Sequence, residues 1–408
     1  MSISSWVTRT PAIRDILGVS TAEMGFILFG LSVGSMIGVL SSGALVARLG
    51  TQPVVLGGMI GIVLSTPAIG FGAATSSALT VCAGLVLFGL GMGCSEVAMN
   101  VEGVDVEATL GVTTLPPMHG FFSLGMLIGA TIGLVLTAID FPVAIHLLSI
   151  GIFAAVVMAT SIRKIPSGVG RIQGCSRTKS HATALCKESK LLLLGLIVLA
   201  MAFSEGTAND WLPLLMVDGH GLTPSGGAAM YAVFAAAMAL GRFLGAPVLT
   251  RFGRISTIRG SALVGGVGLI LVIFPDNQLL AVIGVVLWGM GAALGFPVAI
   301  SAAGESGPNE AARVASVSAA GYVAFLVGPP ALGILGEHFG LRLATTVVLV
   351  LLVLAAIASA ALGTATQIPA TTTPDPARLP AEVWPPDDNQ TLHETVRPVG
   401  GPTPDRRF

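Results

Sequence analysis

The chain has 408 residues, of which 53% are hydrophobic and 10% are charged, and its mean hydropathy is +0.87. Soluble domains carry about 25% charged residues, so a water-soluble fold of this length is excluded and a polytopic, all-α membrane protein is expected. The formal net charge of −1 excludes a generally basic nucleic-acid binder. The four cysteines form no C-x-x-C pair, so we expect no zinc site, no disulfide framework and no cofactor.

Several segments are long and apolar enough to cross a bilayer, which takes about 20 residues of helix. In chain order, the eleven expected spans are 24–47, 53–72, 79–101, 117–138, 143–162, 191–212, 226–250, 258–274, 279–303, 314–335 and 343–363. They predict four parts, a first bundle at 1–162, a linker at 163–190, a second bundle at 191–363 and a tail at 364–408. The tail is rich in proline and polar residues, which predicts disorder.

Lysine and arginine gather on one side of the expected spans. The linker alone contains Arg163, Lys164, Arg171, Arg177, Lys179, Lys187 and Lys190. Because short cytoplasmic segments carry the excess of positive charge, we expect the linker and the tail to be cytoplasmic.

The two halves of the chain repeat each other. The segment GLVLFGLG at 84–91 returns 200 residues later as GVVLWGMG at 284–291. Three further residues return at a spacing of 203, Gly38, Arg48 and Gly50 as Gly241, Arg251 and Gly253. Such a parallel repeat predicts two six-helix bundles.

The repeat also predicts that the first helix of the first bundle is largely missing. Trp211 is expected to end the first helix of the second bundle, and its counterpart by position is Trp6, which only five residues precede.

Twelve helices in two halves, with a Gly–Arg–Gly loop after the second helix, resemble the major facilitator superfamily. Gly43, Arg48 and Gly50 match the loop signature of that family, whereas Ala47 stands where the signature has aspartate. The segments GMGCSEVAMNVEGVDVEATLG, MHGFFSLGMLIGATIG, SWVTRTPAIRDILGVS and EGTANDW resemble the fucose-permease-like branch and allied bacterial inner-membrane permeases of unassigned substrate. The resemblance covers residues 1–363.

That resemblance implies proton-linked movement of a small solute across the bacterial inner membrane, by a multi-pass protein that we expect to be a monomer. It also implies that the first and fourth helices of each half line the solute cavity. If the missing first helix is counted, the span 79–101 that holds Glu96 is the fourth helix, and the span 191–212 that holds Glu205 is the seventh. Each has an asparagine four residues later on the same helix face, Asn100 and Asn209.

A carboxyl group in a low-dielectric medium favours its neutral form, so it can carry a proton. We therefore expect Glu96 and Glu205 to couple protons to the solute, with His119 as a relay from the cytoplasm. The simpler alternatives are that Glu96 is hydrogen-bonded inside the bundle and that His119 bonds a loop carbonyl.

Other polar and aromatic residues are candidates for solute binding or for structural roles. The candidates for solute binding are Asn100, Asn209, Asp210, Trp211, Phe296 and Tyr322. The candidates for gating or structure are Arg48, Arg242, Arg251, Gly50 and Gly253. Asp210 and Trp211 are expected at the outer rim, and Arg242 is expected to hold an acid such as Glu205 or a loop carbonyl.

The sequence favours a secondary active transporter that moves a small polar solute, such as a sugar, with protons by alternating access. Two alternatives stay open. Phe296, Trp288 and Met290 suggest an apolar cavity and an exporter of amphipathic compounds, and the missing first helix is compatible with a non-transporting receptor or remnant. No H-E-x-x-H motif and no paired His/Asp cluster lies at membrane depth, so we expect neither an enzyme nor a metal site.

Overall fold

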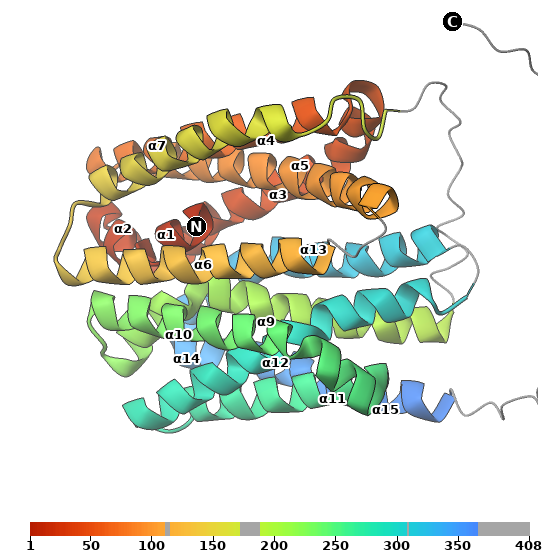
Figure 1. The fold of residues 1–408 in the computed structure, drawn as a ribbon. Helices are drawn as coiled ribbons and strands as arrows, with labels where there is room; N and C mark the ends of the chain where they lie inside the picture. The colour runs from red at the N-terminus through yellow and green to blue at the C-terminus, as the bar shows by residue number, and fades with distance from the viewer. Residues whose placement is uncertain (111–114, 172–187, 308–309, 366–408) are drawn as a thin grey trace, which may run out of the picture. The chain divides into compact units, whose positions relative to one another are not determined.

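The computed structural model describes residues 1–110, 115–171, 188–307 and 310–365. Every regular element in these ranges is helical (Figure 1). Among them, eleven helices are long and apolar enough to cross a membrane, which is the number that the sequence predicts. Residues Met1–Thr364 form one compact unit.

The helices fall into two groups in chain order. The first half comprises α1 (Ser2–Val7), α2 (Thr10–Leu17), α3 (Thr21–Leu49), α4 (Thr51–Ala74), α5 (Ala78–Leu110), α6 (Leu115–Ala138), α7 (Val143–Ser161) and the short η1 (Ile162–Lys164). The second half comprises α9 (Ser189–His220), α10 (Pro224–Phe243), α11 (Gly245–Ile273), α12 (Gln278–Gly304), α13 (Glu310–Phe339), α14 (Leu341–Ala344) and α15 (Thr346–Ala365).

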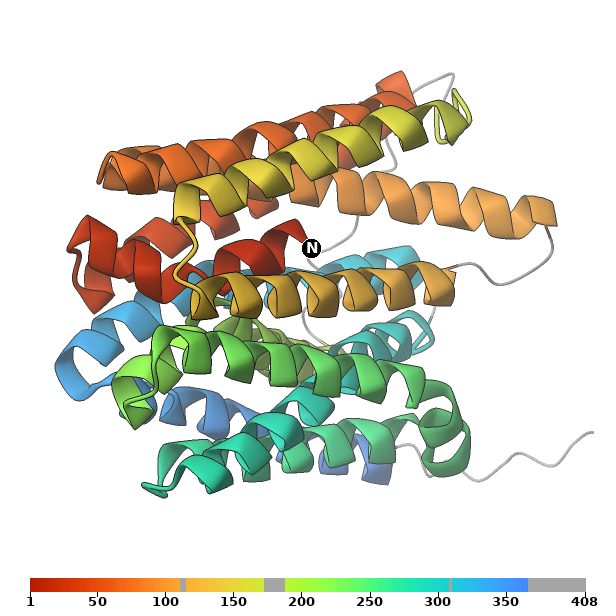
Figure 2. The ribbon, with the colours of Figure 1, turned by 60° about the vertical axis from the view of Figure 1, so that its left-hand side comes forward.

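Two helix pairs join the halves. Helix α3 packs against α13, and α6 packs against α10, while the short α1 and α2 also contact α9 (Figures 1 and 2). We call the end of the bundle that holds Gly50 and Gly253 the basic end, and the end that holds Ser20 and Gly340 the opposite end. Helix α3 therefore runs from the opposite end to the basic end, whereas α13 runs the other way.

Local signals set several helix ends. Ser20 and Glu23 form a capping box at the start of α3, in which each side chain bonds the backbone N–H of the other residue. Gly18 ends α2 and Gly221 ends α9, both in the left-handed conformation that glycine adopts without a steric penalty. Asn277 caps α12 with its side chain. These caps satisfy backbone groups that a helix end would otherwise leave unpaired.

Several span limits differ from those expected. Helix α5 was expected to end at residue 101, but it continues to Leu110. Helix α9 was expected to end at residue 212, but it continues through Pro213 to His220. Helix α10 ends at Phe243 rather than at residue 250, and α11 begins at Gly245 with a kink at Gly253. The reason is that apolar residues continue through the turn between α10 and α11, so hydropathy does not mark the break. A proline inside a helix removes only one backbone donor, which α9 tolerates.

The internal repeat extends to the backbone. Gly50 has φ 90° and ψ 171°, and Gly253 has φ 73° and ψ 170°. A positive φ of this kind favours glycine. Both glycines therefore make the same sharp turn at the basic end, 203 residues apart.

The same helix pairs touch through glycine in both halves. A β-carbon on Gly89 would lie 2.1 Å from the carbonyl oxygen of Leu31, and one on Gly289 would lie 2.7 Å from the carbonyl oxygen of Phe234. Because Leu31 and Phe234 are also 203 residues apart, α5 meets α3 in the way that α12 meets α10. Glycine at these positions lets the backbones approach closely, as is typical of helix packing in lipid.

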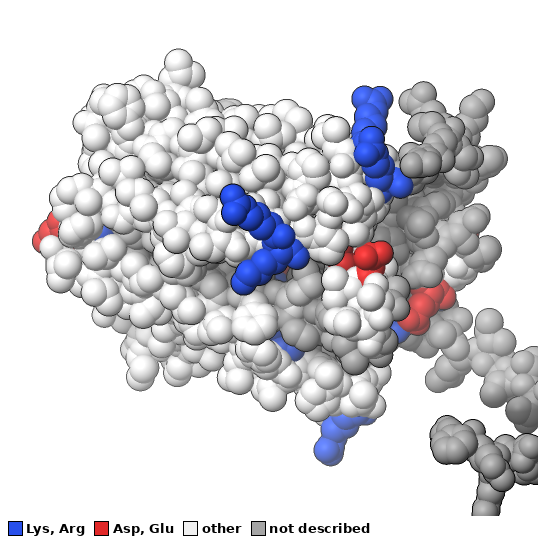
Figure 3. All heavy atoms as spheres, turned by 45° about the horizontal axis from the view of Figure 1, so that its top comes forward, with Lys and Arg blue, Asp and Glu red and all other residues white. Residues whose placement is uncertain are grey.

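The outer surface of the helix bundle is strongly apolar. Leu40, Leu79 and Phe121 are 71%, 81% and 73% exposed, and the face drawn in Figure 3 is mostly uncharged. Large apolar patches of this kind are rare on soluble proteins, and they suit contact with lipid.

Replacement of Gly34 by alanine is expected to destabilise the fold. A β-carbon there would lie 2.0 Å from the carbonyl oxygen of Val86, so the α3–α5 contact would have to separate. Overpacking of this kind costs about 1–3 kcal/mol, which would lower the melting temperature of the detergent-purified protein. Gly43→Ala on the same helix is the matched control, because nothing lies within 4 Å of its β-carbon position. An equal loss of stability in both variants would contradict the packing role of Gly34.

Candidate functional site

The centre of the candidate site is the guanidinium group of Arg242 on α10. Its Nη2 donates to Oε1 of Glu205 on α9 at 3.1 Å, and its Nη1 donates to Oγ of Ser123 on α6 at 3.0 Å. The side chains of Arg242 and Glu205 are 24% and 16% exposed. Because Ser123 belongs to the first half, one partly buried cation links the two halves and pairs with Glu205.

Glu96 on α5 faces this group from the first half. It lies within electrostatic range of Glu205 and of Tyr322 on α13, both of which belong to the second half. Its side chain is nevertheless exposed, so water reaches the space between the halves at this level. In the described part of the chain, Glu96 forms no hydrogen bond or ion pair, unlike Glu205.

The two polar residues that follow on α9 differ in their contacts. Asn209 accepts a hydrogen bond of 3.0 Å from the hydroxyl of Tyr231 on α10, which leaves its amide N–H groups available. Asp210 is partly buried and lies near the same tyrosine. Within the ranges described above, no basic side chain pairs with Asp210.

The expectation that Asp210 and Trp211 mark the outer rim is wrong. Helix α9 continues beyond them to His220, and Trp211 is 0% exposed. Its indole N–H is buried and has no hydrogen-bond partner among the described residues. Trp211 therefore packs inside the bundle, and it does not anchor the protein at a lipid interface.

The candidates Phe296 on α12 and Tyr322 on α13 lie on neighbouring helices, and Tyr322 is within electrostatic range of Glu96. The ring of Phe296 lies against Gly321, where a β-carbon would come within 3.0 Å of it. Tyr322 follows on the same helix and is partly buried, as is Asn100 on α5. By the repeat, Glu96 corresponds to Phe296, so the two halves differ where the charges lie.

The remaining candidates lie apart from this group or outside the described side chains. His119 belongs to α6, but its side chain lies outside the described residues. Arg48 and Arg251 are exposed at the basic end, and the guanidinium of Arg251 lies 5.8 Å from the ring centre of Phe252.

Residues at the opposite end that the sequence did not single out join the halves. Arg14 on α2 forms an ion pair with Asp218 on α9, and the carboxylate of Glu337 on α13 accepts from the backbone N–H of Ala22 at 3.2 Å. The backbones of α3 and α13 also touch here at Gly25. No local signal could have identified these partners, because the members of each pair are hundreds of residues apart.

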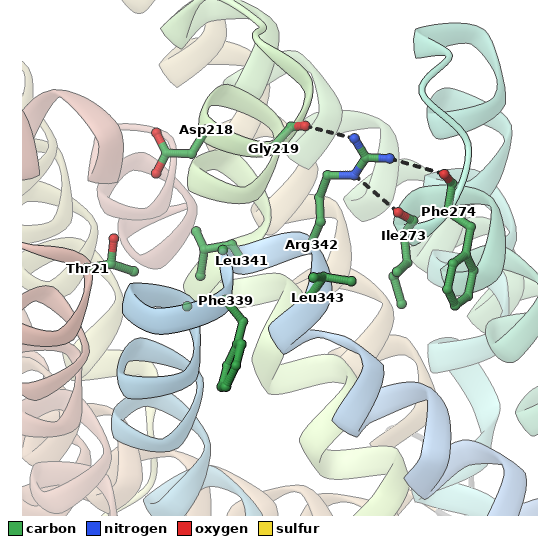
Figure 4. Close-up of a pocket in the computed structure, with 11 residues that line it drawn as sticks. Thr21, Asp218, Gly219, Ile273, Phe274, Phe339, Leu341, Arg342 and Leu343 are labelled. Atoms are coloured by element: carbon green, nitrogen blue, oxygen red, sulfur yellow. Dashed lines mark hydrogen bonds between the residues drawn. The ribbon is translucent and has the colours of Figure 1, made fainter.

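A cavity of about 510 Å³ lies at the opposite end (Figure 4). Arg342 lines this cavity, but its guanidinium group donates to the carbonyl oxygens of Gly219, Ile273 and Phe274 rather than facing a ligand. A guanidinium bound to backbone carbonyls stabilises loop ends, so this cavity is a weaker candidate than the charged group at the centre. Among the described residues, no three potential metal ligands come together.

Loss of either partner of the Arg242–Glu205 pair is expected to lower stability. Arg242→Gln leaves a carboxylate without its cation, and Glu205→Gln leaves the guanidinium without its anion. Each change should cost about 1–3 kcal/mol, measured as a lower melting temperature in detergent. The double variant should be more stable than the sum of the two single losses predicts. Additive losses would show that the pair makes no coupled contribution.

Comparisons with known proteins agree with this architecture. The family model described as Major Facilitator Superfamily matches residues 1–322 and 194–386. An uncharacterized MFS-type transporter of Yersinia pestis is 28% identical over 88% of the chain and 92% of its own length. An uncharacterized transporter of Sinorhizobium fredii is 31% identical over 84% and 89%, and the membrane protein MosC of Rhizobium meliloti is 25% identical over 88% and 86%.

Two solved structures show the same fold. A mutant of the nucleoside transporter NupG has a TM-score of 0.72 at 14% identity, covering 88% of this chain and 96% of its own. The Escherichia coli fucose:proton symporter FucP has a TM-score of 0.58 at 15% identity, with the same coverage of 88% and 96%. With its all-helical fold, its membrane-length helices and a family match across both halves, this chain is a multi-pass membrane transporter of the major facilitator superfamily.

Proposed function

We propose that the protein moves a small polar solute by proton-coupled alternating access, through a site between its two halves. The observation that carries this proposal is that Glu96 of the first half, whose side chain is exposed, lies within electrostatic range of Glu205 of the second half, which pairs with Arg242. Acidic residues at membrane depth are costly, and they usually mark ion or proton pathways.

The contacts suggest different roles for the two acids. Glu205 is paired with Arg242 and holds the guanidinium between the halves. Glu96 has no such partner in the described part of the chain, and it is the group that binds and releases the proton. Asn209 and Asn100 lie one turn from these acids and supply hydrogen bonds to the hydroxyl or amide groups of the solute.

The contacts at the opposite end fit one of the two states that alternating access requires. The Arg14–Asp218 pair and the Glu337–Ala22 bond hold the halves together at that end. We propose that this is the periplasmic end of a bacterial inner-membrane protein, with the basic linker at 163–190 and the tail at 364–408 in the cytoplasm.

The alternative of an amphipathic-compound exporter has less support. Trp288 is 0% exposed, and its indole N–H donates to Ser204 at 2.8 Å. It belongs to the packing between α9 and α12 rather than to an open apolar cavity. Phe296 is the aromatic group that stays available beside the charged site.

Glu96→Gln is expected to abolish the coupling between solute and protons. A glutamine cannot exchange a proton, whereas it keeps the size of the side chain. In proteoliposomes, a pH gradient should drive solute accumulation by the native protein but not by the variant, while solute exchange down its own gradient persists. Tyr231→Phe is the control, because it removes a hydroxyl near the site without removing an acid. Gradient-driven accumulation by Glu96→Gln would contradict the role of Glu96, and a lack of solute movement by the native protein would favour the receptor alternative.

A cross-link at the opposite end is expected to stop transport. In a background with serine in place of the four cysteines, Arg14→Cys and Asp218→Cys would be joined by a bifunctional thiol reagent that reduction cleaves. Joined halves cannot separate at this end, so transport should fall to background and recover on reduction. Arg254→Cys with Glu305→Cys is the matched control, since this ion pair lies within the second half. Undiminished transport by the cross-linked protein would contradict the proposed movement.

A further inference from the structure

Among the described residues at the centre of the bundle, acidic side chains outnumber basic side chains. Three acids lie along the middle of α5 and α9, away from the helix ends, Glu96, Glu205 and Asp210. The basic side chain that contacts any of them is Arg242, and it is bound to Glu205 and to Ser123. Two carboxyl groups therefore lack a basic partner among the described residues.

Glu96 is the uncompensated acid that a solute can reach. Its side chain is exposed, whereas Asp210 is partly buried beside Tyr231. The titratable groups that face Glu96 from the second half are Glu205 on α9 and Tyr322 on α13. One is an anion whose cation is already bound, and the other is a neutral hydroxyl group at neutral pH.

This arrangement disfavours an acidic solute. A carboxylate or phosphate would have to lie near Glu96, and Arg242 could bind it only by releasing Glu205. A neutral solute would displace water from an ionised Glu96 without supplying a positive charge in its place, which is unfavourable. A protonated amine would supply the missing positive charge and donate to the carboxylate in a charge-assisted hydrogen bond.

We propose that the solute is a hydroxylated amine, such as an amino sugar, whose ammonium group binds Glu96 in place of the proton. This inference rests on the proposed transport function and adds the class of solute. Its hydroxyl groups bond Asn100 and Asn209, and its apolar face packs on Phe296. Since one positive charge replaces another on the same carboxylate, the protein exchanges protons for the amine.

The test is equilibrium binding to the full-length protein in detergent, with a matched set of ligands. Glucosamine carries the amine, N-acetylglucosamine has the same ring with the charge removed, glucose has a hydroxyl group instead, and glucuronate carries a negative charge. We expect glucosamine to bind most tightly. Its affinity should fall at mildly acidic pH, although the amine itself becomes more fully protonated, because protons then occupy Glu96.

Glu96→Gln should lower the affinity for glucosamine at least about tenfold, as expected for loss of a charge-assisted hydrogen bond. The same change should remove the pH dependence of that affinity. Glu305→Gln is the control, because it removes one negative charge from a side chain that is 60% exposed at the basic end and that pairs only within the second half among the described residues. Glu96→Asp should retain the preference for the amine, which separates loss of charge from loss of fold.

Each alternative result has a distinct meaning. Preferential binding of glucose or N-acetylglucosamine, with proton-coupled transport of that sugar, would overturn the amine inference and leave the proposed function intact. Preference for glucuronate would overturn the charge argument. Unchanged glucosamine affinity in Glu96→Gln would also overturn it, and a folded protein that neither binds nor moves any of the four ligands would overturn both proposals.

Discussion

The close approach of helix backbones at glycine is the contact on which the rest of the structure depends. In lipid, apolar side chains gain little by leaving one apolar environment for another, so helices associate through tight packing. Gly89 and Gly289 bring α5 against α3 and α12 against α10 with no room for a β-carbon. This packing fixes the rotation of α5, and that rotation turns Glu96 toward the second half. Steric constraints within one half thereby determine which side chains meet between the halves.

The site arises where the repeat is broken. Gly50 and Gly253 keep the same backbone turn, and the paired glycines keep the same packing, because these features maintain the bundle. At the position of Glu96 the second half has Phe296 instead. The repeat gives the two halves the same helix packing. They differ at this position, where the first half has a carboxyl group and the second half has an aromatic ring.

The contacts between the halves are of two kinds, and the difference suits a protein that changes shape. The α3–α13 contact at Gly25 is steric, whereas the Arg14–Asp218 pair is polar and partly exposed. Partly exposed ion pairs contribute about 0–1 kcal/mol each, so they can break and form again during a transport cycle. Arg242 differs in that it donates to both halves at once, to Glu205 on α9 and to Ser123 on α6. The contacts of Arg242 therefore depend both on the charge of Glu205 and on the position of α6.

The sequence by itself determined the membrane class, the number of spans, the repeat and the acids at membrane depth, because hydropathy, spacing and rare charges are local properties of the chain. It did not determine where α9 ends, since Asp210 and Pro213 look like a helix end when their burial is unknown. Nor could it show that Glu205 is paired while Glu96 has no partner among the described residues. That difference depends on which side chains meet across the two halves, and only tertiary packing decides it.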